Sequence, residues 1–353
     1  MSKDMGGAAF VGLLDLASED VGGAALACSD DFFAGMENLV KPGRGIFLPD
    51  EYTDRGKWMD GWESRRKRAE GHDWCIVRLG VRGVVRAVDI DTNHFLGNHP
   101  PFASLEATCA PADASVEALE KAQWSQVLPQ SPLRPGSQNL FALETPTLAT
   151  HLRLRIYPDG GVARLKVWGS ADPEWDRVDV DEETKKLRRD GEVDLASIRN
   201  GALALACSDA FFGPMNNLIA PGRAKNMGGG WETRRKRMPG SDWILVRLGA
   251  PGSVGLVEID TNHFKGNFAD RFALRGIHAP DAKITDLVSV GAYPSPTSRQ
   301  SEWKTILPET KLAASERHFF RDEVAAAGPF THVRLDIYPD GGISRLRLWG
   351  TRT

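Results

Sequence analysis

Apolar and polar residues alternate along several short segments of the chain. The clearest segment is 152–156, where leucine and isoleucine take every second position and arginine takes the positions between them. A period of two is typical of a β-strand that is buried on one face. Pro-Asp-Gly-Gly follows at 158–161, and the apolar period resumes at 165–169. Because these turn residues separate two strand-like segments, the pattern predicts a β-hairpin.

The same period predicts two more short strands, at 76–79 and 84–90, with a glycine-containing turn at 82–83 between them. Amphipathic helical stretches are few, and 114–122 is one candidate. The chain has 36 glycines and 21 prolines among 353 residues, a large share that suits many turns. Short strands joined by such turns predict an all-β fold of jelly-roll β-sandwiches.

Most of the recognisable segments occur twice and in the same order. The clearest pairs are 15–44 with 194–223, 61–68 with 230–237, 73–80 with 242–249, 89–98 with 258–267 and 151–169 with 332–350. The spacing of the first two pairs differs, so the first copy has about ten additional residues between Arg44 and Gly61. A period of this length is far too long for a solenoid unit, and it predicts two homologous globular domains.

The duplication sets the expected domain boundaries. We expect a first jelly-roll repeat at 1–170 and a second at 193–353. The segment between them, 171–192, is dense in Asp, Glu, Lys and Arg and has no apolar period, which is typical of a charged linker. A chain of 353 residues is long enough for two domains that each bury a core.

Charge, cysteine spacing and the N-terminus exclude several classes of function. The formal net charge is −3, so no general field attracts nucleic acid or an anionic membrane. The apolar run at 8–14 is too short for a membrane-spanning helix and for most secretory signals. The four cysteines have no Cys-x-x-Cys spacing, which favours a reducing compartment. We therefore expect a cytoplasmic protein that binds neither nucleic acid nor membrane, and homo-oligomers remain an open alternative.

One duplicated octet, at 61–68 and 230–237, places a tryptophan and a glutamate before four consecutive cations. Such a charge run is often only a solvated face. The two copies differ by a single Ser-to-Thr change, however, which favours a binding site. Arginine suits a planar carboxylate because it presents two parallel N–H donors. Glu63 and Glu232 are then candidates for acid–base chemistry.

A second duplicated motif, Asp-Thr-Asn-His-Phe, follows an apolar strand at 91–95 and 260–264. Loops that follow strands often carry function. Histidine can exchange a proton near neutral pH, a carboxylate can orient it, and asparagine can bind an amide or urea group. The set also resembles divalent-metal ligands, although it lacks the spacing of a zinc or calcium motif. A structural hydrogen-bond network at the strand end is the remaining interpretation.

Other duplicated residues are expected to lie in the core. The Phe-Phe pairs at 32–33 and 211–212 are large and apolar, and Cys28 and Cys207 follow alanine-rich runs. Residues of these types are usually buried in globular proteins. Packing is therefore the expected role of both groups.

The octets, the Asp-Thr-Asn-His-Phe motifs and the closing Tyr-Pro-Asp-Gly-Gly segments, each present twice in order, resemble the allantoicase family. The resemblance extends from about Asp15 to Gly350. It implies two jelly-roll repeats related to galactose-binding-like domains. It also implies a hydrolase of purine and allantoin degradation, which converts allantoate, a linear ureide, and water to ureidoglycolate and urea. The family motif often has Ala where this chain has Asn93 and Asn262, so the resemblance does not support urea binding there.

Allantoate carries a carboxylate and two ureido groups on one carbon, so its site must hold a planar anion and move protons. The residue types suggest the roles. The predicted catalytic residues are Glu63, Asp91, His94, Glu232, Asp260 and His263. The predicted substrate-binding residues are Asn38, Arg44, Trp62, Arg65, Arg66, Arg68, Asn98, Asn217, Arg223, Trp231, Arg234, Arg235, Arg237 and Asn267. No cofactor is expected, and a divalent metal is the less favoured alternative.

Two other interpretations remain open from the sequence. The chain could be a non-catalytic tandem module that binds carbohydrate or another ligand, because jelly rolls often bind without catalysis. Such modules favour exposed aromatic residues over clustered Arg, Glu and His. The chain could also be an enzyme in which one repeat keeps the working site and the other assembles subunits.

Overall fold

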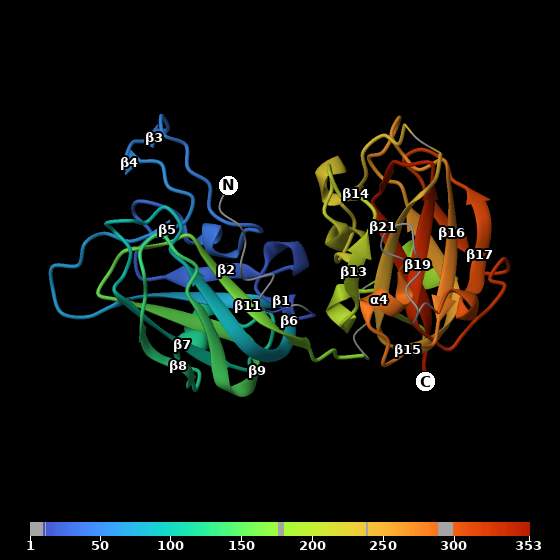
Figure 1. Ribbon diagram of the computed structural model, residues 1–353. Helices are drawn as coiled ribbons and strands as arrows, with labels where there is room; N and C mark the ends of the chain where they lie inside the picture. The colour runs from blue at the N-terminus through green and yellow to red at the C-terminus, as the bar shows by residue number, and fades with distance from the viewer. Residues whose placement is uncertain (1–9, 11, 176–179, 238, 289–298) are drawn as a thin grey trace. The chain divides into compact units, whose positions relative to one another are not determined.

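The computed structural model describes residues 10, 12–175, 180–237, 239–288 and 299–353. The chain divides into two compact units, Met1–Pro173 and Glu174–Thr353, and each contains one copy of the duplicated segment (Figure 1). None of the helices in these described ranges is both long enough and apolar enough to span a membrane.

The first unit is built almost entirely from strands. In chain order they are β1 (Leu14–Asp15), β2 (Ala24–Cys28), β3 (Tyr52–Thr53), β4 (Gly56–Lys57), β5 (Trp62–Glu63), β6 (Asp73–Asp91), β7 (Phe102–Thr108), β8 (Ser125–Pro132), β9 (Leu140–Tyr157), β10 (Gly161–Val162) and β11 (Arg164–Ala171). The helical elements are the 3₁₀ turns Glu19–Val21 and Met36–Val40 and the short helix α2 (Val116–Glu120). This content confirms the prediction of an all-β unit.

Two long strands, β6 and β9, take part in both layers of the sandwich. Residues 73–78 of β6 pair with β2 and with the second half of β9, and β7 and β8 extend this layer. Residues 83–91 of β6 pair with β11 and the first half of β9, and β1 lies beyond β11. The register breaks between Arg78 and Gly83, where β6 passes between the layers. The two layers therefore share one core, as a β-sandwich requires.

The second unit repeats this arrangement. Its strands are β12 (Val193–Asp194), β13 (Leu203–Cys207), β14 (Trp231–Glu232), β15 (Asp242–Asp260), β16 (Arg271–Ile277), β17 (Lys304–Lys311), β18 (Arg317–Phe320), β19 (Phe330–Tyr338), β20 (Gly342–Ile343) and β21 (Arg345–Arg352). The helical elements are α3 (Glu182–Leu187), α4 (Ile284–Leu287) and the 3₁₀ turns Ile198–Asn200, Met215–Ile219, Met227–Gly229 and Gln300–Glu302. β18 and β19 both pair with β15 and correspond to the two halves of β9. The prediction of two tandem jelly-roll sandwiches is confirmed.

The alternating segment at 152–156 is buried on one face, as its period indicates. Leu152, Leu154 and Ile156 of β9 are inaccessible to solvent. Arg153 points to the other face, where its Nε donates to Glu106 of β7 at 2.6 Å. The apolar period therefore identifies the core face of the strand correctly.

The predicted hairpin at 152–169 is wrong. β9 and β11 do not pair with each other, because both pair with β6, which lies between them. The Pro-Asp-Gly-Gly turn leads instead into β10, which pairs with β5. The strands predicted at 76–79 and 84–90 are two parts of β6, and the helix predicted at 114–122 contains α2. Alternation identifies a strand but does not identify its partner.

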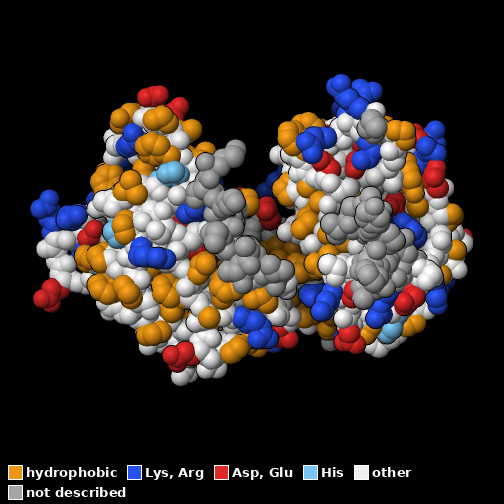
Figure 2. Space-filling model, viewed as in Figure 1, with side chains coloured by type: hydrophobic (Ala, Val, Ile, Leu, Met, Phe, Trp, Pro, Cys, Tyr) orange, Lys and Arg blue, Asp and Glu red, His pale blue; other side chains and the backbone are white. Residues whose placement is uncertain are grey.

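The additional residues of the first copy form a small hairpin, β3–β4, which projects from the first sandwich (Figure 1). Its apolar side chains are largely exposed, and hydrophobic atoms are visible on this projection (Figure 2). Lys57 Nζ lies 4.8 Å from the ring centre of Phe47 and 5.4 Å from that of Tyr52. The projecting hairpin thus holds its aromatic rings by cation–π contacts rather than by burial.

The segment predicted as a linker is partly folded onto the second sandwich. Asp181 accepts a hydrogen bond from Thr184 N–H at 2.9 Å and caps the start of α3. Arg317 of β18 donates to Asp181 at 2.8 Å and to Glu183 at 2.9 Å. Arg321 pairs with Glu192 at 2.9 Å. The charge density of this segment therefore serves to attach residues 181–192 to the second unit.

Candidate active site

A buried ring positions the duplicated Gly-Trp-Glu segment at one end of the first sandwich. β5 pairs with β10, and Phe95 lies fully buried against both strands. A Cβ atom at Gly161 would lie 2.0 Å from Phe95 Cδ1, and one at Gly61 would lie 2.6 Å from Phe95 Cε2. Both positions need glycine because the ring occupies the space of a side chain. The packed ring therefore fixes the backbone of Glu63.

Glu63 receives one neutral hydrogen-bond donor. Asn98 Nδ2 donates to Glu63 Oε1 at 2.6 Å, and the Asn98 carbonyl accepts from Gly161 N–H at 2.8 Å. The Glu63 side chain is half-buried, and this burial raises its pKa above the ordinary value, although the bond from Asn98 lowers it. A carboxyl group with a raised pKa suits general acid–base catalysis near neutral pH.

The second repeat holds the same pair. Asn267 Nδ2 donates to Glu232 Oε1 at 2.5 Å. β14 pairs with β20, and Phe264 lies against Gly230 and Gly342 as Phe95 does in the first repeat. The structure thus brings together predicted site residues from different motifs, and it does so in both repeats.

The cations that follow Glu63 are of two kinds. Arg65 Nε donates to Asp30 at 2.7 Å, and its guanidinium lies 5.1 Å from the ring centre of Phe32. Lys67 Nζ forms an ion pair with Asp73 at 2.7 Å. Arg66 and Arg68 are exposed, and neither has a hydrogen-bond or ion-pair partner among the residues that the structure describes. These two guanidinium groups are the ones available to an external anion.

The second repeat divides its cations in the same way. Arg234 donates to Asp209 at 2.8 Å and lies 5.0 Å from the ring centre of Phe211. Arg235 and Arg237 are exposed and make no polar contact within the described part of the chain. The equivalence of the two repeats supports the division into held and available arginines.

Two predictions about aromatic residues are wrong. Trp62 and Trp231, predicted to bind substrate, are inaccessible to solvent, and the Trp62 indole N–H donates to the Asp30 carbonyl at 2.8 Å. The Phe-Phe pairs at 32–33 and 211–212, predicted to be core residues, are exposed by 37–38% and by 59–63% respectively. The carboxylates of Asp30 and Asp209 accept hydrogen bonds from the backbone N–H groups of Phe32 and Phe211. These turns hold the phenylalanine rings at the surface.

Asp91, the last residue of β6, forms a bidentate pair with Arg44, which lies in the loop before β3. Arg44 Nε and Nη2 donate to the two carboxylate oxygens of Asp91 at 2.7 and 2.8 Å, and Asp91 is fully buried. The backbone N–H of Asn93 also donates to Asp91, and its side chain donates to the Gly45 carbonyl at 2.7 Å. Asn38 donates to the Gly61 carbonyl at 3.0 Å. These residues hold the loops in place through contacts within the protein.

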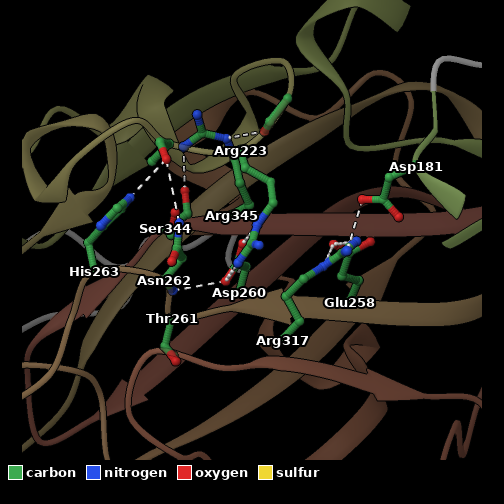
Figure 3. A network of polar contacts seen from close by, with 12 residues as sticks. Asp181, Arg223, Glu258, Asp260, Thr261, Asn262, His263, Arg317, Ser344 and Arg345 are labelled. Carbon is green, nitrogen blue, oxygen red and sulfur yellow. Dashed lines mark hydrogen bonds and ion pairs between the residues drawn. The ribbon is translucent and has the colours of Figure 1, made fainter. Parts of the chain in front are cut away.

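The Arg223–Asp260 pair is the counterpart in the second repeat, with a distance of 2.9 Å (Figure 3). Asn217 donates to the Gly230 carbonyl at 3.1 Å, as Asn38 does to Gly61. Because Gly161 is opposite Glu63 and Arg164 is opposite Asp91 in the first repeat, the buried pair and the glutamate lie at the same end of the sandwich.

The two predicted histidines have different surroundings. The exposed His94 ring stacks on Phe47 at a centroid distance of 5.5 Å. His263 Nε2 lies 3.0 Å from the Ala224 carbonyl (Figure 3). Both residues have a positive φ, of 68° and 71°, which is uncommon for a residue other than glycine. Within the described contacts, neither ring bonds to the aspartate of its own motif.

A cavity of 390 Å³ lies beside Asp260 in the second repeat. Four arginines from its wall were not among the predicted site residues: Arg199, Arg317, Arg345 and Arg347. Figure 3 shows Arg317 between Asp181 and Glu258, and Arg345 near Arg223 and Asp260. For Arg345 and Arg347 the sequence did offer a signal, because these two cations take alternate positions at the start of β21, where the residues between and after them are apolar.

A metal site has no support in the described residues. No three side chains of His, Cys, Asp or Glu come together there as a set that could hold an ion. Asp91, which belongs to the motif that resembles metal ligands, has both oxygens occupied by Arg44 and the Asn93 N–H.

A family model described as the allantoicase repeat matches residues 14–172 and again 193–353. The chain belongs to the allantoicase family. A probable allantoicase of Photobacterium profundum is 44% identical over 344 residues, 98% of each chain. A probable allantoicase 1 of Burkholderia mallei is also 44% identical, over 96% of this chain and 94% of that relative. The crystal structure of allantoicase from Saccharomyces cerevisiae has a TM-score of 0.77 and 30% identity, over 99% of this chain and 98% of that chain.

Membership of the allantoicase family accounts for the duplication. The family unit is one repeat, and each of the two matches covers one complete β-sandwich with its octet, its Asp-Thr-Asn-His-Phe motif and its closing strand. The carboxyl–amide pair occurs in both units, as Glu63 with Asn98 and as Glu232 with Asn267.

Proposed function

We propose that this protein is an allantoicase, which hydrolyses allantoate to ureidoglycolate and urea. The observation that carries the proposal is the match of both repeats, over nearly the whole chain, to the allantoicase family. The carboxyl–amide pairs support it, because hydrolysis of a C–N bond needs a group that gives and takes a proton. A ligand-binding module without catalysis is less well supported, since relatives of 44% identity are named as enzymes.

Glu63 is the proposed general acid and base. The reaction breaks the bond between the central carbon and one ureido nitrogen. Protonated Glu63 gives its proton to that nitrogen, which leaves as urea, and the carboxylate then takes a proton from the water whose hydroxyl adds to carbon. Asn98 positions the carboxyl group through the 2.6 Å bond. Glu232 and Asn267 have the same roles in the second repeat.

The exposed arginines are proposed to bind the substrate carboxylate. Arg66 and Arg68 follow Glu63 in the chain and make no described contact of their own. Each presents paired donors that match a planar carboxylate. Arg44 is excluded from this role because its donors already hold Asp91. The buried pair instead stiffens the loops on which the site is built.

Urea release from allantoate by the purified protein tests the function. Wild-type protein should release urea, and Glu63→Gln combined with Glu232→Gln should lose nearly all of this activity, on the order of 10²-fold or more for a lost general acid–base. Glu70→Gln, at an exposed position nearby in the chain, is the matched control and should retain full activity. No urea from the wild type, with metals supplied and with metals removed, would overturn the proposal.

We also propose that the reaction needs no cofactor and takes place in the cytoplasm. The absence of a metal requirement rests on the occupied oxygens of Asp91. Exhaustive chelation should leave the rate of urea release unchanged. A loss of activity that returns with one divalent metal would contradict this part of the proposal.

A further inference from the structure

A buried arginine in the second repeat lacks the carboxylate that its counterpart has in the first. Arg164 of β11 is 2% exposed, and its Nη2 pairs with Asp60 at 2.7 Å. The motif spacing aligns Arg164 with Arg345 and aligns Asp60 with Gly229. The second repeat therefore keeps the buried guanidinium and has lost the side chain that neutralises it.

The hydrogen bonds of Arg345 show which donor is left over. Its Nε donates to the Gly222 carbonyl at 2.9 Å, and its Nη1 donates to three further backbone carbonyls at 2.6–3.0 Å. Its Nη2, the atom that corresponds to the Asp60 partner in the first repeat, has no partner among the described residues. Arg345 is only 5% exposed, and it forms part of the wall of the 390 Å³ cavity.

A second cation, Arg347, lies beside Arg345, and its Nε is close to a carboxylate, that of Asp194 at 3.5 Å. Arg347 lies two residues along the same strand, where the first repeat has Lys166, and it also lines the cavity. Arg347 Nη1 is buried without a hydrogen-bond partner in the described structure. Burial and the repulsion from Arg347 lower the pKa of Arg345 to about 10, although the charge of Asp260, opposite it on β15, acts to raise it. A buried cation without a matched anion is unfavourable, and an anion beside it removes this cost.

We propose that this cavity binds a small carboxylate anion, one oxygen of which accepts from Arg345 Nη2 in the place that the Asp60 carboxylate takes in the first repeat. The volume lies in the usual range of small-molecule sites. The walls also offer polar side chains, Ser197 and Asn200, for the remainder of such a ligand. This inference concerns binding in the second repeat and does not depend on the proposed hydrolysis.

Acetate is the probe, and thermal unfolding of the full chain is the measurement. Acetate, compared with chloride at equal ionic strength and pH, should raise the unfolding midpoint of the wild type in a saturable way. At ten times the dissociation constant the rise should be about 3 °C. No acetate-specific rise would overturn the proposal.

Gly229→Asp introduces into the second repeat the aspartate that the first repeat has at the equivalent position, Asp60. A Cβ atom there would lie 3.1 Å from that of Ala224, so a small adjustment accommodates it. This variant should melt at a higher temperature than the wild type and should not respond to acetate. An acetate response equal to that of the wild type would overturn the proposal.

Asp60→Gly is the reciprocal variant, and it keeps the test decisive if Gly229→Asp does not fold. It removes the carboxylate partner of Arg164 Nη2, so that Arg164 becomes equivalent to Arg345. Its midpoint should fall, and acetate should restore part of the loss in addition to the wild-type response. An acetate response no larger than that of the wild type would show that a vacant guanidinium in this position does not recruit carboxylates.

Discussion

At the scale of single residues, the carboxyl groups of the two motifs have different chemical uses. Both oxygens of Asp91 are bound by Arg44, and breaking such a buried pair is costly. Glu63 has one neutral donor, Asn98, and a raised pKa. Proton transfer is therefore assigned to Glu63. The sequence marked both carboxylates as candidates, but it could not separate them, because the difference lies in partners that are distant in the chain.

The unpartnered arginines give the first prediction at this scale. Arg66→Lys with Arg235→Lys, or Arg68→Lys with Arg237→Lys, keeps the charge but removes the planar pair of donors. The pair that binds the substrate carboxylate should lose about 1.5–3 kcal/mol of transition-state stabilisation, roughly 10- to 150-fold in kcat/KM. Urea release at several allantoate concentrations measures this loss.

Arg65→Lys with Arg234→Lys is the internal control, because both arginines are already held by aspartates. It should change kcat/KM much less. Small and equal losses in all three double variants that disappear at high salt would indicate only general electrostatic attraction. That pattern would contradict a specific carboxylate clamp.

A buried histidine gives the second prediction. Burial, with the nearby charge of Arg78, lowers the pKa of His151 to about 4, whereas the unfolded value is near 6.5. The unfolded chain therefore takes up the proton first as the pH falls. The contribution of His151 to the free energy of unfolding is complete above pH 6.5 and is lost as the pH falls towards 4, by about 3 kcal/mol.

Urea denaturation of the wild type and of His151→Gln at pH 7 and pH 4.5 measures this effect. The difference in the free energy of unfolding between the two proteins should shift by about 2–3 kcal/mol in favour of the variant at the lower pH. His94→Gln, at an exposed position, is the control. An unchanged difference for His151→Gln would show that this side chain is not buried in its neutral form.

At the scale of elements, the strands could be predicted from the sequence, but their pairing could not. The period of two correctly placed Leu152, Leu154 and Ile156 in the core. It also suggested a hairpin with the segment at 165–169, although β6, from far earlier in the chain, separates the two. A local pattern carries no information about a partner that arrives from a distance. The exposed Phe-Phe pairs were missed for a related reason, because apolarity does not report the turn that holds them outside.

The contact of β5 and β10 with Phe95 gives the third prediction. Gly161→Ala places a methyl group 2.0 Å from the ring, so either the ring or the strand must move. The free energy of unfolding should fall by about 1–3 kcal/mol, as for other overpacked cores. Gly97→Ala, where no atom lies within 4 Å, is the matched control and should be nearly silent. Equal stability of the two variants in urea denaturation would contradict the packing argument.

At the scale of the whole molecule, duplication followed by divergence explains what the two repeats share. Both contain the carboxyl–amide pair and two exposed arginines that have no polar partner in the described part of the chain. The β3–β4 hairpin belongs to the first repeat, and the cavity at Arg345 lies in the second. The duplicated motifs predicted the shared part. The differences could not be predicted in this way. The change from Asp60 to Gly229, for example, matters only because the buried Arg345 lies beside Gly229, and the sequence does not show this contact.

Single substitutions distinguish whether both repeats work. If each carboxyl–amide pair acts alone, Glu63→Gln and Glu232→Gln should each leave a substantial fraction of the kcat for urea release, and the two fractions should add up to roughly the wild-type value. Only the double variant should then lose nearly all of the rate, because no general acid–base remains. If one repeat has lost activity, one single variant should behave as the double variant and the other as the wild type. If each single variant alone costs most of the rate, the two glutamates act together, and the assignment of one complete catalytic group to each repeat is wrong.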